Sequence, residues 1–578
     1  MNLAYVHEAI AEVIPDRDCI VYGARRFSWA ETTDRTRRLA DVLRRHGLGC
    51  HRERDELANW ESGQDHVALY LHNGNEYLEG MLGAFKARCA PFNVNYRYVE
   101  EELLYLFDNA DARAILYHAA FAPMLAKIRD KLPGEPLLIQ VADTSGHALL
   151  PGALDYEEAL ASASPSAPES LSEDDLYILY TGGTTGMPKG VMWEHQNHWL
   201  ANGQGVSSAP DRKTPPASAE EHAANVAAKG GGRRSYPACP QMHGTGLFIS
   251  LTALTNGGVV VTTDTARFDP VDAWTIVERD KVNVMAVVGD AFCKPLLKVL
   301  DEEPGRFDLS SLRHIISSGV MWSPEVKTGL LRHHDGLVLM DTFGASEAMG
   351  VGSSTTTKDA GAKVAKFRLG PNVKVFTEDH QEVLPGSGVS GFVAKAGGIP
   401  SGYYKDPEKT ARTFPVINGE RYSIPGDWCQ VESDGTLTLL GRGSVCINTA
   451  GEKVYPEEVE EALKTHANVD DALVVGVPDD KWGQSVTGIV QVADDGAFDE
   501  EQLRAHVRTA LAGYKCPKRI LVIDTIGRAN NGKADYKRLT QFASARAFSD
   551  QFPFEFGECA GQSDVGHAHT PTGRRSFW

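Results

Sequence analysis

The stretch Tyr180-Thr-Gly-Gly-Thr-Thr-Gly-Met-Pro-Lys-Gly190 gathers glycines, hydroxyl side chains and a lysine in one short loop. Its glycines allow tight turns that bring backbone N–H groups close to an anion, and the hydroxyls and the ammonium group add donors and positive charge. The residues concerned are Thr181, Gly182, Gly183, Thr184, Thr185, Gly186 and Lys189. Residues 175–180, just before the loop, have the composition of a strand. The stretch therefore predicts a phosphate-binding loop that follows a strand.

Two other interpretations of this loop are weaker. A P-loop NTPase needs Gly-Lys-Ser/Thr in direct succession, whereas Met187 and Pro188 precede Lys189 here and Gly190 follows it. A flexible Gly/Thr surface turn would explain a lone glycine loop, but the density of donors in this one favours nucleotide chemistry.

The chain has 578 residues, of which 42% are hydrophobic and 23% charged, as expected for a globular protein of two or three domains. Helical and strand-like segments alternate as far as about residue 440, which predicts a layered α/β fold. We expect strands at 66–72, 282–288, 337–340, 472–477 and 486–492, and helices at 76–88, 100–107, 456–466 and 500–511. We expect a loop at 90–95, and loops or insertions at 50–64 and 207–232, with Asp290 as a candidate cap of the helix that follows it.

The formal charge of -19 argues against a nucleic-acid partner, since such binding depends on a basic surface. The nine cysteines are scattered without metal-ligand spacing, no apolar run is long enough to span a membrane, and the first residues lack the features of a signal peptide. We therefore expect a cytoplasmic protein with reduced thiols. The basic cluster at 515–519 is either a solvated loop or a contact for a phosphate of an anionic cofactor.

Further motifs follow the loop in a fixed order. They are Thr342-Phe-Gly-Ala-Ser-Glu347, Tyr422-Ser-Ile-Pro-Gly-Asp427, Gly441-Arg442 with the stretch 451–460, and Asn531-Gly-Lys533. Together with the loop, this series resembles the adenylate-forming superfamily, which includes acyl-CoA synthetases, luciferases and peptide-synthetase adenylation domains. The similarity extends from about Phe27 to Leu539.

The resemblance implies a large N-terminal domain with several subdomains of sheets and helices at 1–440, and a small mobile α+β domain at 441–545. Residues 546–578 have little periodicity and are expected to form a loosely ordered tail. At the expected hinge, Ser444 and Val445 stand where many family members have a charged residue, and Gly443 could absorb the rotation.

The resemblance also implies ATP, Mg²⁺ and CoA as cofactors and a small carboxylic acid as substrate. ATP converts the acid into acyl-AMP and pyrophosphate, and a thiol then displaces AMP. In this scheme Thr181–Thr185 and Lys189 hold the β- and γ-phosphates, Glu347 binds Mg²⁺, and Lys533 reaches the bridging oxygen and the substrate carboxylate. The remaining residues assigned to nucleotide and CoA are Thr342, Ser346, Asp427, Arg442, Gly451 and Lys453.

For the acid, the resemblance points to the segment Cys239-Pro-Gln-Met-His243-Gly-Thr-Gly246, in which His243 would act as a gate. The other residues assigned to the acid pocket are Gly289, Ser318, Gly319 and Gly344. Each assignment has a plainer alternative. His243 could be an ordinary polar residue, Glu347 a carboxylate in the first turn of a helix, Asp427 a turn residue and Lys533 a surface lysine.

We expect an AMP-forming acyl-CoA synthetase for a medium- or long-chain fatty acid or another bulky apolar acid. Two alternatives stay open: a fatty acyl-AMP ligase that delivers to a carrier protein, and a nucleotide-binding regulatory module without turnover. The oligomeric state is also open, with a homodimer as one alternative.

Overall fold

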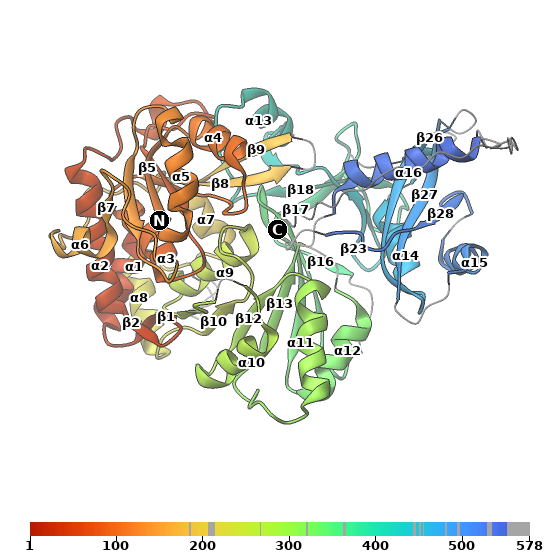
Figure 1. Ribbon diagram of the computed structural model, residues 1–578, viewed down its shortest axis with the longest axis horizontal. Coiled ribbons are helices and arrows are strands. Elements are labelled where there is room, and N and C mark those ends of the chain that lie inside the picture. The colour runs from red at the N-terminus through yellow and green to blue at the C-terminus, as the bar shows by residue number, and fades with distance from the viewer. Residues whose placement is uncertain are drawn as a thin grey trace, which may run out of the picture.

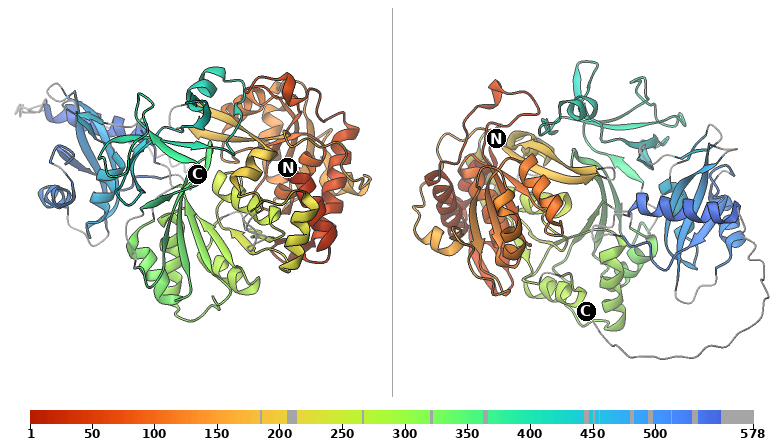
Figure 2. Two further views of the ribbon diagram at one scale, coloured as in Figure 1. Left: turned by 180° about the vertical axis from the view of Figure 1, so that it is seen from behind. Right: turned by 45° about the horizontal axis from the view of Figure 1, so that its top comes forward.

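A computed structural model of the chain describes thirteen stretches. They are residues 1–183, 186–205, 214–265, 267–319, 322–361, 366–442, 447–449, 452–454, 456–479, 483–493, 498–511, 513–528 and 534–551. The chain forms a large body from helices and two sheets, and the last described part forms a smaller lobe beside it (Figures 1 and 2). The predicted α/β class is confirmed.

The first sheet contains fifteen strands, with parallel pairs from β1 to β14 and antiparallel pairs beyond them at both ends. Its path is β2 (Arg25–Ser28), β1 (Asp18–Tyr22), β11 (Val259–Thr262), β10 (Arg234–Pro237), β12 (Val284–Val287), β13 (His314–Ser318), β14 (Val338–Ala345), β15 (Ala348–Thr356), β16 (Phe367–Leu369), β23 (Thr436–Arg442), β22 (Asp427–Val431), β18 (Ser390–Ala396), β21 (Glu420–Ser423) and β20 (Val416–Ile417), and β17 (Val373–Phe376) pairs with β18. The apolar run of β12 is buried at every residue, as expected for a central parallel strand.

The second sheet has the order β19 (Gly402–Tyr403), β9 (Gly186–Glu194), β8 (Leu176–Gly183), β4 (Ala90–Asn93), β3 (His66–Tyr70), β5 (Ala112–His118), β6 (Leu137–Val141) and β7 (Leu154–Asp155). The prediction of a loop at 90–95 was wrong for its first four residues, which form β4. The strand is wholly buried between β3 and β8, and burial there outweighs the preference of Pro91 and Asn93 for turns.

Thirteen helices in the described residues cover these two sheets. They are α1 (Leu3–Val13), α2 (Trp29–Arg45), α3 (Asn75–Lys86), α4 (Glu100–Asn109), α5 (Ala122–Ile128), α6 (Tyr156–Ala161), α7 (His195–Ala201), α8 (Ala219–Ala228), α9 (Gly244–Thr255), α10 (Pro270–Arg279), α11 (Asp290–Glu302), α12 (Pro324–His333) and α13 (Pro407–Thr413). Of the two predicted alternatives for 207–232, a loop or an insertion, the loop is wrong for residues 219–228, because α8 lies there. Ser218 accepts a hydrogen bond from the Glu221 N–H at the start of α8, and the alanine-rich sequence favours a helix.

Asp290 does not cap α11 in the predicted way. The N-cap residue is Gly289, and the Asp290 carboxylate instead accepts a hydrogen bond from the backbone N–H of Ser323, at 3.1 Å. Asp290 therefore ties the start of α11 to the segment that leads into α12.

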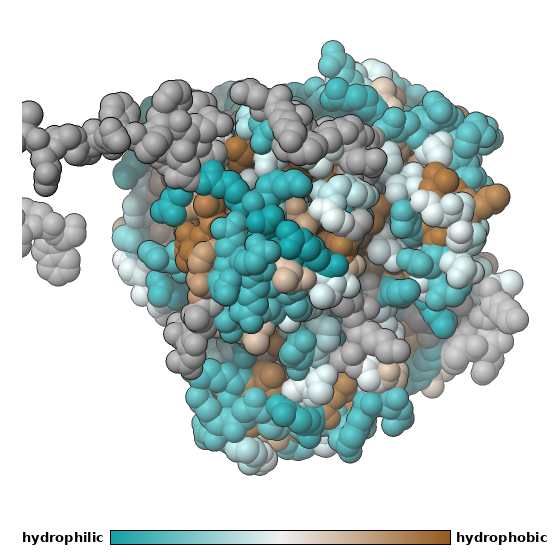
Figure 3. Space-filling view, turned by 90° about the vertical axis from the view of Figure 1, so that its right-hand side faces the viewer, coloured by the Kyte–Doolittle hydropathy of each residue, from teal (hydrophilic) through white to brown (hydrophobic). Residues whose placement is uncertain are grey.

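The smaller lobe contains a five-stranded sheet with three helices. The strands are β25 (Glu452–Val454), β24 (Ile447–Thr449), β27 (Gly483–Val492), β26 (Val469–Asp479) and β28 (Arg519–Val522), and the helices are α14 (Pro456–Lys464), α15 (Glu500–Ala510) and α16 (Tyr536–Gln551). Helix α16 continues to Gln551, into the first residues of the expected tail, and the rest of that tail lies outside the described residues. The outer face of the lobe is mainly hydrophilic, with small apolar patches (Figure 3).

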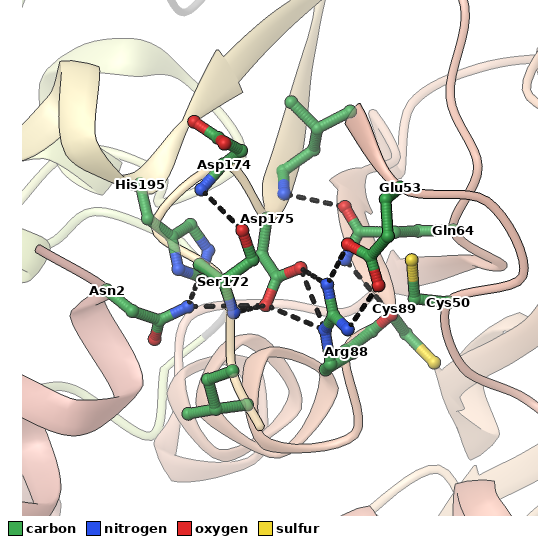
Figure 4. A network of polar contacts seen from close by, with 12 residues as sticks. Asn2, Cys50, Glu53, Gln64, Arg88, Cys89, Ser172, Asp174, Asp175 and His195 are labelled. Atoms are coloured by element: carbon green, nitrogen blue, oxygen red, sulfur yellow. Dashed lines mark hydrogen bonds and ion pairs between the residues drawn. The ribbon is translucent and has the colours of Figure 1, made fainter. Parts of the chain in front are cut away.

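An ionic network holds the start of β8, the strand that leads to the glycine-rich loop (Figure 4). Arg88 contacts Asp175 at 3.0 Å and Glu53 at 2.8 Å, and burial raises the pKa of Asp175. The backbone N–H of Leu176 donates to Gln64 Oε1 at 2.7 Å. The first residue of β8 is thus fixed by groups from several distant segments.

Candidate active site

The glycine-rich loop lies in a hairpin made by β8 and β9. Thr181 of β8 is the backbone partner of Lys189 of β9, so both candidate phosphate ligands lie at the same level of the hairpin. Lys189 Nζ lies 2.8 Å from Asp406 Oδ2, and this hydrogen bond raises the pKa of Lys189. The Lys189 side chain is 40% exposed, which leaves it accessible to a ligand. Thr184 and Thr185 lie outside the described residues.

Glu347 lies in the turn between β14 and β15, together with Ser346. The alternative of a carboxylate in the first turn of a helix is therefore wrong, because antiparallel strands flank it on both sides. Tyr403 donates its phenolic O–H to Glu347 Oε1 at 2.5 Å, and Ser423 donates its hydroxyl to the Glu347 carbonyl oxygen at 2.7 Å. Both the side chain and the backbone of Glu347 are therefore held by neighbouring strands.

Strand β9 connects the loop to the turn that carries Glu347. After Lys189, Val191 of β9 pairs with Tyr403 of β19, whose hydroxyl reaches Glu347. Trp193 of β9 then donates its indole N–H to the Ser346 carbonyl oxygen at 2.9 Å. Strand β9 thus links the candidate phosphate-binding lysine to the turn that carries the candidate metal-binding carboxylate, although the two residues come from different sheets.

The carboxyl ends of β12, β13 and β14 form an edge of the parallel part of the first sheet, where ligands of α/β proteins usually bind. Ser318 donates its hydroxyl to the Thr342 carbonyl oxygen at 3.1 Å, so the ends of β13 and β14 are joined. Gly289 and Gly319 have φ of +56° and +91°, which favour glycine. Gly344 leaves no room for a Cβ, which would lie 2.9 Å from the Ala348 carbonyl oxygen. The structure brings Gly289, Ser318, Gly319 and Gly344, which are all assigned to the acid pocket, to adjacent strand ends, together with Thr342, which is assigned to the nucleotide.

His243 is the N-cap residue of α9 and is half-buried. Its neighbour Met242 is fixed by Asn93, whose amide donates to the Met242 carbonyl oxygen at 2.7 Å. Asn93 also exchanges two hydrogen bonds with the backbone of Tyr180, the residue before the loop. Asn93 therefore links the segment before His243 to the strand that leads into the phosphate loop. The sequence did not predict this role of Asn93, because the residue was expected to lie in a loop.

Asp427 and Arg442 occupy opposed positions on the antiparallel strands β22 and β23, where they are backbone partners. This pairing fits their shared assignment to the ribose of ATP. Lys453 lies in β25 of the smaller lobe, with its side chain outside the described part. Gly451 and Lys533 lie wholly outside the described residues, so their assigned roles stay predictions.

Tyr403 and Asp406 contact the candidate site residues Glu347 and Lys189, and the sequence motifs gave no sign of either contact. Asp406 followed by Pro407 is a helix-start signature, and Asp406 does cap α13 by accepting a hydrogen bond from the Lys409 N–H. That signal predicts the cap but gives no sign of the ion pair with Lys189, which depends on tertiary structure.

The donor set suits magnesium held jointly by protein and nucleotide. Mg²⁺ usually takes one or two carboxylates together with substrate phosphates and water, rather than a full protein cage. Within the described residues there is no group of three or more His, Cys, Asp or Glu residues arranged to hold a metal ion, and Glu347 lies close to the loop strand. Glu347 would hold the metal, and the loop would hold the phosphates that complete its coordination.

Two family models match most of the chain. The family described as AMP-binding enzyme matches residues 7–404, and the AMP-binding enzyme C-terminal domain matches residues 458–533. The chain therefore belongs to the AMP-binding enzyme family, and it is an enzyme of the adenylate-forming type.

Particular relatives are acyl-CoA ligases. The chain is 44% identical over 535 residues to the medium-chain acyl-CoA ligase Mig of Mycobacterium avium, covering 92% of this chain and 96% of that protein. It is 39% identical over 547 residues to a 3-oxocholest-4-en-26-oate–CoA ligase of Rhodococcus rhodochrous, covering 93% and 95%. In fold it resembles an anthranilate CoA ligase solved with anthranoyl-AMP, with a TM-score of 0.78 at 18% identity over 95% of this chain and 98% of the other.

Within the described residues, none of the helices is long and apolar enough to cross a bilayer.

Proposed function

We propose that this enzyme activates a carboxylic acid with ATP and then transfers the acyl group to CoA. The observation that carries the proposal is the joining of the Lys189 hairpin to the Glu347 turn through β9 and β19. With ATP bound, the Lys189 hairpin and the Glu347 turn would supply the cationic and metal-binding groups that a triphosphate needs.

In the first half-reaction, a carboxylate oxygen of the acid attacks the α-phosphorus of ATP, and the bond from that phosphorus to the bridging oxygen breaks. Pyrophosphate leaves, and acyl-AMP remains. Lys189 would neutralise charge on the departing phosphates, and Glu347 would orient Mg²⁺, which supplies further charge neutralisation when bound. Asp427 and Arg442 would fix the ribose so that the attack is in line.

In the second half-reaction, the CoA sulfur attacks the acyl carbon, and AMP leaves. We propose that residues 441–545 act as a mobile domain that presents Lys533 for the first step and the segment around Gly451 and Lys453 for the second. In support, the described contacts between this lobe and the large body include the exposed ion pair of Lys294 with Asp470, at 3.2 Å. An exposed ion pair adds little stability and can be exchanged easily.

The proposed acid is a medium- or long-chain fatty acid or a bulky apolar acid such as a steroid-derived one. The relatives at 44% and 39% identity support this class through their names. His243 and the strand ends that carry Gly289 and Gly319 would line the acid pocket. The seven free cysteines of the described residues support a cytoplasmic location.

The test is mass spectrometry of products after incubation with ATP, Mg²⁺, CoA and a mixed acid library. We expect acyl-AMP, pyrophosphate and acyl-CoA from apolar acids. Acyl-AMP without acyl-CoA would favour transfer to a carrier protein. Complete absence of pyrophosphate despite ATP binding would favour the regulatory module.

A further inference from the structure

One short segment, Gly402–Lys409, contacts both halves of the triphosphate site. It contains β19 and the beginning of α13, and it pairs with β9 through Gly402 with Met192 and Tyr403 with Val191. Two of its side chains reach the site: the Tyr403 hydroxyl contacts Glu347, and the Asp406 carboxylate contacts Lys189.

The Tyr403 hydroxyl holds the Glu347 carboxylate in one position. The residue is 2% exposed, and its ring is fixed by the pairing of β19 with β9. The Lys409 ammonium lies 4.1 Å from the centroid of the Tyr403 ring, where its charge strengthens the phenolic O–H as a donor. A carboxylate that is already oriented by a hydrogen bond binds a metal with less loss of conformational freedom.

Asp406, unlike Tyr403, would oppose binding of the nucleotide. Its Oδ1 accepts the Lys409 N–H at 3.0 Å as the helix cap, which directs Oδ2 to Lys189 Nζ at 2.8 Å. The Asp406 carboxylate thus forms an ion pair with the same ammonium group that a phosphate would contact. Its negative charge also repels a phosphate. ATP or pyrophosphate must compete with Asp406 for Lys189.

We propose that Tyr403 and Asp406 are positioning residues of opposite effect: Tyr403 strengthens magnesium binding at Glu347, and Asp406 weakens the hold of Lys189 on phosphates so that pyrophosphate can leave. This inference rests on the proposed function. It adds a segment that lies outside the recognised motifs and whose two side chains tune metal and phosphate affinity separately.

The test is equilibrium binding of ATP and of pyrophosphate by calorimetry, each titrated over a range of Mg²⁺ concentrations. Tyr403→Phe should raise the Mg²⁺ concentration needed for half-maximal ATP binding by about tenfold, a typical effect of losing a partner of a metal ligand. The matched control is Tyr404→Phe, since the Tyr404 hydroxyl bonds Asp111 at 2.6 Å instead of a site residue. The control should retain the wild-type Mg²⁺ dependence.

Asp406→Asn keeps a good helix cap but removes the charge. It should bind pyrophosphate about threefold more tightly, the size expected for a partly exposed ion pair, and pyrophosphate should inhibit turnover at correspondingly lower concentrations. Its Mg²⁺ dependence should stay close to that of the wild type.

Equal Mg²⁺ dependence of Tyr403→Phe and Tyr404→Phe, or unchanged pyrophosphate affinity in Asp406→Asn, would overturn this inference while leaving the proposed function intact. Failure of the wild-type protein to bind ATP with Mg²⁺ would overturn both. If Tyr403→Phe also lowers the melting temperature, a double-mutant cycle with Glu347→Gln decides. Tyr403→Phe should then change Mg²⁺ dependence only when Glu347 is present, and the same change without Glu347 would refute the proposal.

Discussion

The indole N–H of Trp193 donates a hydrogen bond to the carbonyl oxygen of Ser346, at 2.9 Å. The strand that leaves the glycine-rich loop is therefore bonded directly to the turn that carries Glu347. Because the two elements belong to different sheets, their relative position depends on a few such contacts.

Replacing Trp193 by Phe should weaken binding of Mg²⁺·ATP. Loss of one buried hydrogen bond corresponds to about 1 kcal/mol, or roughly fivefold in affinity, if the bond holds the turn in its binding position. Calorimetric titration checks this prediction. Trp274→Phe is the control, because Trp274 is equally buried and donates to the Leu296 carbonyl oxygen at 3.0 Å, between α10 and α11. Equal ATP affinity in the two variants would contradict the prediction.

Lys327 and Asp341 form a buried ion pair behind the end of β14. Their side chains are 0% and 5% exposed, and Lys327 Nζ lies 2.6 Å from Asp341 Oδ2. Lys327→Met should lower the free energy of unfolding by about 3–5 kcal/mol, because it leaves a buried carboxylate without its counter-charge. Urea unfolding measures the change.

The double variant Lys327→Met with Asp341→Asn should recover part of that stability, since it removes the uncompensated charge. For comparison, Lys281→Met breaks an exposed pair with Asp308, at 2.9 Å, and should lower the free energy of unfolding far less than Lys327→Met does. Similar losses of unfolding free energy for Lys327→Met and Lys281→Met would show that burial of an ion pair does not determine how much its removal destabilises the protein.

Stability should fall as the pH drops below 6.5. Burial lowers the pKa of His118 and of His198 to about 4, so the unfolded chain binds more protons than the folded one between that value and the ordinary histidine pKa. The stabilisation is complete above pH 6.5 and is lost progressively on acidification, by about 2 kcal/mol for each histidine at pH 5. Unfolding midpoints in urea from pH 7.5 to pH 5 test the slope.

His198→Gln removes one of these titrations and should make the pH dependence shallower. It also alters the contact with the Tyr177 hydroxyl, at 2.9 Å, so the comparison concerns the slope with pH rather than stability at one pH. An unchanged slope in His198→Gln would rule out His198 as a source of the acid sensitivity.

Lys533→Ala should suppress formation of acyl-AMP while largely sparing the capture of preformed acyl-AMP by CoA. The ammonium group is proposed to neutralise charge at the bridging oxygen, which matters only in the first half-reaction. Rapid-quench assays of the two half-reactions measure this. Equal loss in both, with an unchanged melting temperature, would remove Lys533 from its proposed role.

Local patterns in the sequence predicted much of the fold. The apolar run at 282–288 contains β12, and residues 456–466 contain α14, because each run has the periodicity of its element. The strand at Ala90–Asn93 was missed because its proline and asparagine favour turns locally, whereas burial between two strands decides the outcome.

The motifs also predicted candidate site residues, several of which the structure brings to adjacent strand ends, but not the residues that contact them. Thr342, Gly344 and Glu347 could be assigned from one short motif. Tyr403 and Asp406 could not, because their contacts with Glu347 and Lys189 join positions far apart in the chain. Such contacts follow from the pairing of β19 with β9, and no local pattern reveals that pairing.

The separation of β9 from β19 along the chain allows a reconstitution experiment. A fragment ending near residue 205 would contain Lys189 and Trp193, and a fragment from residue 214 onward would contain Glu347, Tyr403 and Asp406. Neither polypeptide alone would possess a complete triphosphate site. Coexpression should restore nucleotide binding only when the two pieces associate and β19 adds to the edge of its sheet, so that complementation would report directly on assembly of the two halves.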